Sequence, residues 1–344
     1  MKAICTLLIF ISGMGMINAQ KFTNAGEYMG FIQKQYQEIS KDTWSYISAV
    51  AHGKSARKVE KRRMEVITTT QKALNTIKGL QPFDGDKTLR DSAVSYLTLS
   101  LNVVREDYGK IMDLEAIAEQ SFDAMEAYLL AQEKAGEKMD QAGEMMEVVT
   151  KAFAEKHGVT LIESKDQLGK KMEIASEVIK YYNQIYLVFF KSYKQEAYML
   201  DAVQKADVNG VEQNKTSLNQ FAKEGLEKLK EFKPYNNDGS IIAACNELLK
   251  FYVMETEEKI SSITDFLIKK ENFDKKNAAF QAKKEKDRTQ ADIDQINAAG
   301  KEYNEAVNNY NKTNTELFNK RKALLDNWNK TVQTFLDKQI PQKK

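Results

Sequence analysis

The sequence contains few residues that interrupt helices. Only 3 Pro and 16 Gly occur among 344 residues, and these two residue types are the least favourable in a helix interior. Good helix formers such as Ala, Glu, Lys, Leu and Gln are abundant instead. This composition predicts an all-α protein with long helices.

Histidine is scarce, and neither sign of charge prevails. The 51 Lys and Arg nearly balance the 49 Asp and Glu, whereas a nucleic-acid-binding protein usually has a basic excess or stripe. We therefore expect no nucleic-acid partner, and we interpret the basic residues 54–63 and the acidic residues 255–258 as solvated helix faces. His52 and His157 each precede a Gly at an expected helix end, where a polar or cationic side chain favours the helix dipole.

The sequence also lacks the patterns that carry common chemistry. We find no phosphate-binding loop, no Gly-x-Ser-x-Gly elbow and no Glu-x-x-His pair of the kind that binds iron in helical bundles. We therefore predict no catalytic residues, no cofactor-binding residues and no metal ligands. The protein is expected not to be an enzyme.

The N-terminus is typical of a secretory signal peptide. Lys2 supplies the positive charge, residues 4–17 are predominantly apolar, and the small Ala19 suits cleavage after it. An uncleaved anchor is the alternative, but the apolar run is shorter than the about 20 residues that a spanning helix needs. The expected location is the periplasm, the cell surface or the extracellular medium.

Cleavage after Ala19 would leave a chain with little to anchor or cross-link it. Cys245 would be the only remaining cysteine, so the mature protein would have no internal disulfide. Cys245 lies on an expected apolar helix face, which favours a buried and inert thiol. No later stretch is long and apolar enough to span a bilayer, so we expect no transmembrane segment in the mature chain.

Two proline turns indicate an internal duplication. Pro82 and Pro234 are each followed by an aromatic residue and then by Asp, Asn or Gly, and they lie 234 − 82 = 152 residues apart. Amphipathic helices alone would match by chance, but turn landmarks in the same order and spacing would not. Other residues that repeat at 152 or 153 residues include Asp86 and Asp238, Leu97 and Leu249, and Tyr28 and Tyr181.

The predicted fold class is therefore a tandem duplication of an up-down four-helix-bundle-like unit with long, coiled-coil-like helices. Ser121 and Asn272 mark the start of the last helix of each copy, and Thr289 with Asp292 leaves open an interruption near Arg288. The expected helices span residues 25–51, 55–79, 88–120 and 121–156 in the first copy, and 165–206, 211–232, 240–270 and 273 onward in the second. The expected division is a signal peptide at 1–19, a first repeat at 20–158, a second repeat at 164–340 and a frayed tail at 341–344.

The most unusual stretch is apolar around a whole helix rather than along one stripe. Such a helix is buried on several sides, or it contacts a partner or lipid. One interpretation is that it packs against its own bundle on one side and against the first bundle on the other. The alternatives are membrane contact and a partner or ligand surface, for which tyrosine is well suited. The residues that we single out are Tyr181, Tyr182, Tyr186, Phe189, Phe190 and Tyr193.

Several of these features together resemble a family of uncharacterised exported or surface all-helical bacterial proteins of unknown function. The features are the signal peptide, the segment LQPFDGDKTLRDSA at residues 80–93 and the second proline turn at residues 234–238. The resemblance implies an exported all-helical protein. It implies no activity and no functional residues.

We therefore expect an exported, non-enzymatic helical protein with a binding or scaffold role in the periplasm or at the cell surface. Its partner would be a protein or a surface component, contacted through helical faces. The alternative is a membrane-active, pore-forming-like helical protein, which would need an apolar hairpin able to enter lipid. Residues 181–193 are the only candidate for that role, and they lack a matching partner segment.

The signal-peptide prediction can be checked on the exported protein. Expression in a bacterium should give a mature chain that begins at Gln20, as measured by intact mass. The substitution Ala19→Arg should leave residues 1–19 attached, because signal peptidase needs a small residue at the cleavage point. A wild-type protein that keeps residues 1–19 would favour the uncleaved anchor.

Overall fold

The computed structural model describes residues 22–161 and 167–341. The expected signal peptide and residues 342–344 of the expected tail lie outside these ranges. The regular structure within them is helical, apart from two isolated bridges inside turns. The prediction of an all-α protein with several long helices is therefore confirmed.

Two π-helices connect α3 to α4 and α8 to α9 without a break, so the described part of the chain forms eight continuous helices. The elements are α1 (Ala25–Ala51), α2 (Ala56–Lys78), α3 (Thr88–Asn102), η1 (Val103–Asp107), α4 (Tyr108–Ala118), α5 (Phe122–Lys156), α6 (Gln167–Gln204), α7 (Val208–Leu229), α8 (Ser240–Met254), η2 (Glu255–Lys259), α9 (Ile260–Ala282), η3 (Glu285–Asp287) and α10 (Gln290–Gln339).

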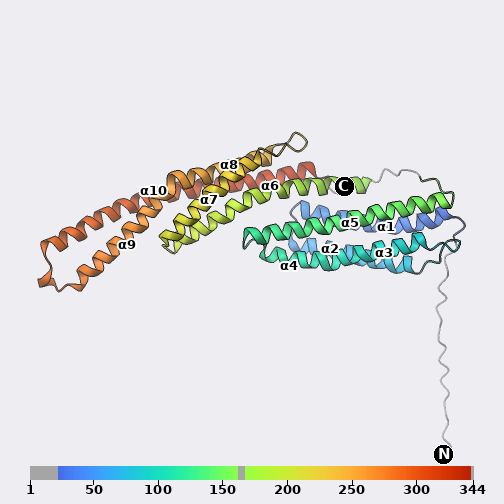
Figure 1. Cartoon of the computed structure of the whole chain (residues 1–344), viewed down its shortest axis with the longest axis horizontal. Coiled ribbons are helices and arrows are strands. Elements are labelled where there is room, and N and C mark those ends of the chain that lie inside the picture. The colour runs from blue at the N-terminus through green and yellow to red at the C-terminus, as the bar shows by residue number, and fades with distance from the viewer. Residues whose placement is uncertain (1–21, 162–166, 342–344) are drawn as a thin grey trace, which may run out of the picture.

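The helices form an elongated molecule (Figure 1). Helices α1 to α5 run alongside one another at one end, and α6, α7, α8 and the C-terminal part of α10 form the next group. The pair formed by α9 and the N-terminal part of α10 continues past the ends of α6 and α7 to the far end of the molecule.

Local capping signals explain where several helices begin and end. Asn24 and Ser121 lie in extended conformation and accept hydrogen bonds from the first turns of α1 and α5, which satisfies otherwise unpaired N–H groups. His52 and His157 occupy the C-terminal ends of the same helices, as expected, and a glycine with positive φ follows each.

The break expected near residue 271 is wrong. Asn272 does not cap a new helix, because α9 continues through it to Ala282. Phe273 stacks on Tyr303 of α10 with ring centroids 5.2 Å apart. This tertiary contact keeps α9 running along its neighbour, and it outweighs the capping preference of a single Asn.

The interruption that the sequence leaves open near Arg288 is present. The last helix, expected from residue 273 onward, instead begins at Gln290. Thr289 accepts a hydrogen bond from the backbone of Asp292, and the Asp292 carboxylate accepts one from the backbone of Thr289. This reciprocal capping box is a strong helix start.

Each half has its own apolar core. The core of the first half includes Tyr28, Ile32, Leu74, Ile77, Leu97 and Phe153. The core of the second half includes Ile185, Leu218, Leu249, Trp328 and Phe335, and it extends to Trp44, Ala51, Ala118 and Met125 of the first half. Because burial of apolar surface is the main stabilising term in folding, the two halves also stabilise each other where they meet.

The first proline turn is closed by Asp86. Its Oδ1 atom accepts hydrogen bonds from the Thr88 backbone N–H at 2.9 Å and from the Thr88 hydroxyl at 2.6 Å. Its Oδ2 atom lies 2.7 Å from Lys156 Nζ and 3.1 Å from His157 Nε2 at the end of α5. The bond from Lys156, followed by those from Thr88 and His157, holds the pKa of Asp86 well below its usual range.

The second proline turn has the same arrangement. Asp238 accepts a hydrogen bond from the Ser240 backbone N–H at 3.1 Å, and Lys338 near the end of α10 pairs with it at 2.7 Å. Lys338, and then Ser240, lower the pKa of Asp238 to about 2. In both halves, one carboxylate therefore binds the first backbone N–H of a helix and also fixes the end of the last helix against the turn.

The role of the turn carboxylate can be tested by removing it. The substitution Asp86→Ala should lower the free energy of unfolding at pH 7 by about 1 to 2 kcal/mol, the usual effect of losing a helix-capping carboxylate. Because folding lowers the pKa of Asp86, its contribution is present above the unfolded-state pKa and is lost as pH falls through the folded-state pKa. The difference from wild type should therefore shrink under acidic conditions.

Urea denaturation followed by circular dichroism would measure both effects. The matched control is Asp113→Ala, because Asp113 is exposed on α4 and exposed substitutions usually change stability by less than about 0.5 kcal/mol. Equal effects of the two substitutions would contradict the role assigned to Asp86.

Candidate functional site

The aromatic stretch singled out in the sequence lies on α6. Phe189 and Phe190 are only 5% and 2% exposed, and Tyr193 is 37% exposed. Tyr181, Tyr182 and Tyr186 are partly buried and pack against the core of the second half. The stretch therefore has a buried side and an accessible side.

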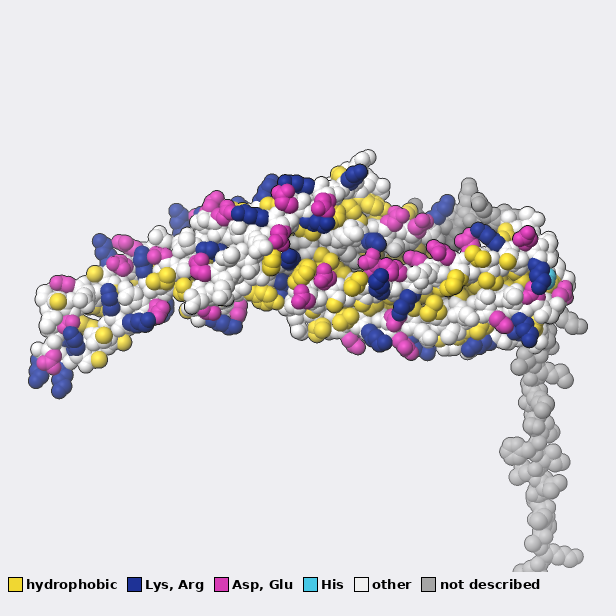
Figure 2. Space-filling view, viewed as in Figure 1, with side chains coloured by type: hydrophobic (Ala, Val, Ile, Leu, Met, Phe, Trp, Pro, Cys, Tyr) yellow, Lys and Arg dark blue, Asp and Glu magenta, His cyan; other side chains and the backbone are white. Residues whose placement is uncertain are grey.

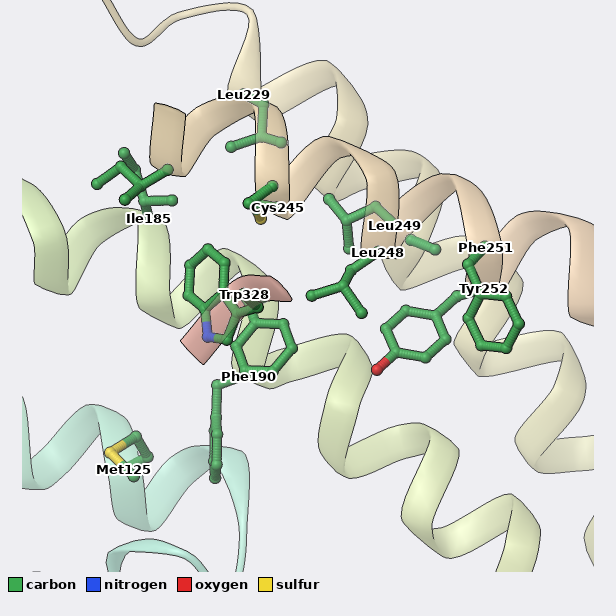
Figure 3. Packing of buried hydrophobic residues seen from close by; sticks show 14 of the residues in the cluster. Met125, Ile185, Phe190, Leu229, Cys245, Leu248, Leu249, Phe251, Tyr252 and Trp328 are labelled. Carbon is green, nitrogen blue, oxygen red and sulfur yellow. The ribbon is translucent and has the colours of Figure 1, made fainter. Parts of the chain in front are cut away.

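The buried side of this stretch belongs to an apolar cluster with residues from both halves of the chain. The ring of Phe189 lies 4.8 Å from the ring of Trp328 on α10, and Phe190 stacks on Tyr186 at 5.5 Å. Met125 of α5 belongs to the same cluster and lies at its edge, next to the second half (Figure 3). The cluster that contains Phe189 and Phe190 therefore includes residues of both halves. A partner surface at the accessible Tyr193 stays a prediction.

Polar contacts accompany this apolar junction between the halves. His52 Nδ1 lies 2.6 Å from an oxygen of Asp337, and Lys180 pairs with Glu133 at 2.7 Å. The hydroxyl of Tyr198 donates to the backbone oxygen of Gln120 at 3.0 Å. The two residues of each contact lie far apart in the sequence, so no local pattern could have predicted these contacts.

A buried cluster of charged side chains lies close to this junction, inside the second half. The guanidinium of Arg321 on α10 binds two carboxylates at once. Its Nε donates to Glu196 of α6, and its Nη2 donates to Glu255 of η2 at 2.5 Å. The side chains of Glu196 and Glu255 are 2% and 0% exposed. Charged groups are rarely buried so fully unless they are paired.

The π-helix η2 provides one of these two carboxylates. Glu255 is its first residue, and π-helical turns are often found at functional sites. The Oε2 atom of Glu255 and the hydroxyl of Tyr252, one turn earlier, have no hydrogen-bond partner among the described residues. An unpartnered buried oxygen is costly, so this cluster is the least satisfied part of the second core.

Burial controls the electrostatics of the cluster. It raises the pKa of Glu196, although the charge of Arg321 acts in the opposite direction. Burial likewise raises the pKa of Glu255, and the negative charge of Glu196 raises it further, against the effect of Arg321. One guanidinium can neutralise only one carboxylate. Two ionised glutamates would therefore leave one uncompensated negative charge in the core.

Sequence reasoning missed this cluster. The interpretation of residues 255–258 as a solvated face is wrong for Glu255, which is fully buried. Arg321 occupies a position on the apolar seam of α10, four residues after Leu317. A charged residue at a seam position was the one available signal, but its partners lie 66 and 125 residues away.

Other groups offer less chemistry. Cys245 is free and fully buried, and burial raises the pKa of its thiol, so the predicted burial is confirmed. Within residues 22–161 and 167–341, no group of three or more His, Cys, Asp or Glu side chains is placed to hold a metal ion. In the same ranges, none of the helices has the length and apolar character needed to cross a bilayer.

Comparison of the chain with models of protein families, with curated proteins and with solved structures finds no match. The resemblance to a family of exported helical proteins therefore stays a prediction, which rests on the expected signal peptide and on residues 80–93 and 234–238.

The aromatic junction can be tested through stability. The substitution Phe190→Ala should lower the free energy of unfolding by about 3 to 5 kcal/mol, because it leaves a cavity in a packed core. Urea denaturation followed by the fluorescence of Trp44 and Trp328 would measure this. Phe318→Ala is the matched control, since Phe318 is 60% exposed and should change stability by less than about 0.5 kcal/mol. A similar loss of stability in both variants would contradict the role of Phe190 in packing the junction.

Proposed function

We propose that this chain is an exported, non-enzymatic helical binding protein that arose by duplication, and that an arm lengthened by additional residues in its second half contacts the partner. The arm is residues 268–316, the distal parts of α9 and α10 with their connection. The N-terminal segment supports export, and the form of the arm supports the binding role.

The spacing of structural landmarks supports the duplication. The π-helices begin at Val103 and Glu255, and 255 − 103 = 152. Helices α3 and α8 begin at Thr88 and Ser240, also 240 − 88 = 152 residues apart. A π-helix is rare, so its occurrence at the same place in both halves is difficult to attribute to helical periodicity alone.

A set of three aromatic rings also recurs at the turns. Tyr28 packs on Phe83 at 5.7 Å and on Phe153 at 6.0 Å. Tyr181 packs on Tyr235 at 5.4 Å and on Phe335 at 5.9 Å. The pairs Tyr28 and Tyr181, Phe83 and Tyr235, and Phe153 and Phe335 thus take equivalent places, at spacings of 181 − 28 = 153, 235 − 83 = 152 and 335 − 153 = 182 residues.

The spacing between equivalent residues of the two halves is not constant, and its change shows where the second half has additional residues. Because the spacing rises from 152 to 182 between the turn and the last helix, the second half has 182 − 152 = 30 additional residues. They lengthen α9 and α10 at the end that projects from the bundle (Figure 1). Divided over two helices, this is about 15 residues each, or roughly 22 Å at 1.5 Å per residue.

The arm is a two-helix structure with little core of its own. Between residues 268 and 316, only Ala299 and Ala306 are buried. Stacked rings hold the pair together, with Phe266 on Tyr310 at 4.4 Å and Phe273 on Tyr303 at 5.2 Å. The visible face of the arm carries both signs of charge (Figure 2).

This form is the observation that carries the proposed function. A helix pair with a narrow apolar seam and polar outer faces is typical of an element that bridges or contacts another molecule. The first half forms a bundle of α1 to α5 without such an arm. The additional residues therefore support a role that the bundle fold does not require, and contact with a protein partner fits long, exposed helical faces best.

The test is a variant that lacks only the addition. Residue 118 corresponds to residue 270 at a spacing of 152, and residue 122 corresponds to residue 304 at 182. Replacing residues 271–303 by the connection of the first half, Glu119-Gln120-Ser121, should therefore give a folded protein with two short bundles. Circular dichroism and denaturation would show whether it folds.

The binding role is then measured by site-specific photo-crosslinking in intact producing cells. A photoreactive residue at the exposed Asn308 of the arm should give an adduct of defined mass. The same residue at the exposed Asp113 of α4 is the control and should give none. The shortened variant keeps Asn308 and, probed at that position, should lose the adduct. Equal adducts from both positions, or none from several arm positions, would contradict the arm as the binding element.

A further inference from the structure

We propose that Glu196 and Glu255 bind one shared proton at neutral pH, and that its release weakens the packing of α10 against α6 and α8 at the base of the arm. This inference is independent of the proposed function, because it concerns a buried site and not the partner.

The geometry leaves a place for the proton. Arg321 donates one bond to each carboxylate, so one oxygen of each glutamate faces the guanidinium. The second oxygen of Glu255 has no hydrogen-bond partner among the described residues, and the hydroxyl of Tyr252 has none either. A carboxyl group with a proton becomes a donor, whereas an ionised one can only accept. Protonation therefore lets one carboxyl group of the pair donate a hydrogen bond to the other.

The balance of charge in the cluster also favours one proton on the glutamate pair. With one proton on the pair, Arg321 and one ionised glutamate neutralise each other, and the core carries no net charge. Without the proton, two carboxylates share a single guanidinium, and a buried uncompensated charge is strongly destabilising. Two adjacent carboxylates commonly hold one proton between them for this reason.

Charged groups on the neighbouring helices do not alter this count, because they pair outside the cluster. On α7, Lys215 binds Glu212 at 2.6 Å, and Lys223 binds Glu257 at 2.7 Å. At the end of η2, Lys259 binds Glu316 of α10 at 3.1 Å. The groups that act on the Glu196–Glu255 pair are therefore Arg321 from α10 and Tyr252 from α8.

A metal ion fits the site less well than a proton. No third His, Cys, Asp or Glu joins the two carboxylates within the described residues. The cationic Arg321 already lies between them, and its charge opposes a second cation. A proton needs no coordination shell.

The equivalent position in the first half lacks the charges. At spacings of 153, 152 and 182 residues, Glu196, Glu255 and Arg321 correspond to Thr43, Val103 and Met139. Val103 is buried in a small apolar cluster, against which Met139 packs. Both halves thus share the π-helix, but only the second half has ionisable residues at these three positions.

The sign of the pH dependence follows from the raised pKa values. A carboxyl group whose pKa rises on folding stabilises the folded state fully below its unfolded-state pKa, and this contribution is lost as pH rises through the folded-state pKa. The unfolded value for glutamate is about 4.5. The second half should therefore lose stability as pH rises above that value, with the unfolding constant increasing by about tenfold per pH unit until the proton is released.

The substitution Glu255→Gln tests this, because an amide mimics the protonated carboxyl without titrating. Urea denaturation at pH 5 and pH 8 should show similar stability for the two proteins at pH 5 and a clearly more stable variant at pH 8. Glu196→Gln should behave in the same way if Glu255→Gln does not fold. Glu257→Gln lies in the same π-helix but is exposed, so it should keep the wild-type pH dependence.

Two spectroscopic measurements complete the test. Infrared spectra of the folded wild type at pH 7 should contain the C=O band of a protonated carboxylic acid, which both Glu→Gln variants should lack. Hydrogen exchange of residues 317–325 should accelerate from pH 6 to pH 8 more in the wild type than in Glu255→Gln.

The same pH dependence in the wild type and Glu255→Gln, together with no protonated-acid band, would overturn the proposal. So would a stabilisation at pH 8 by potassium or sodium chloride that choline chloride at equal ionic strength does not reproduce, because the pair would then bind a metal cation.

Discussion

The contact between the last helix of each half and its proline turn organises much of the structure. In the first half, Phe153 and Lys156 return to the aromatic ring and the carboxylate of the turn. In the second half, Phe335 and Lys338 do the same. Since this end of the last helix is held at both an apolar and a charged contact, its register along the bundle is set. Additional residues can then be accommodated only at the opposite end, where α9 and α10 form the arm.

The same register determines the buried charge cluster. With Phe335 at the turn, α10 places Trp328 against Phe189 and Arg321 between Glu196 and Glu255. A shift of α10 by one residue would move Arg321 about 100° around the helix, away from both carboxylates. Apolar packing thus positions the charges, and the charges in turn penalise any alternative packing of α10.

The two halves differ in the length of one helix pair and in the side chains around the π-helix. The first half is a compact bundle whose seam is apolar around η1. The second half combines a longer pair of helices with a buried charged cluster at the base of the arm. The proximity of the two features places a titratable site at the point from which the arm extends, so the stability of this point depends on proton binding.

Some errors of the sequence-based expectations have a common physical cause. The helix start expected near residue 273 rests on Asn272 and Asp274, which are good capping residues, but a ring stack between α9 and α10 carries the helix past them. Glu255 belongs to an acidic run that would be solvated on an isolated helix, yet α6 and α10 cover it. In both cases a neighbouring helix overrides a local preference.

The sequence by itself determined the helical content, most helix ends and the two proline turns, because capping, glycine placement and apolar periodicity act within a few residues. It also contained the spacing from which duplication is inferred. Only the tertiary structure decided which aromatic side chains of residues 181–193 are buried, that Arg321 meets two distant glutamates, and that α9 runs on into an arm. Those outcomes depend on which helix faces meet, and contacts between residues up to 125 positions apart leave no local trace in the chain.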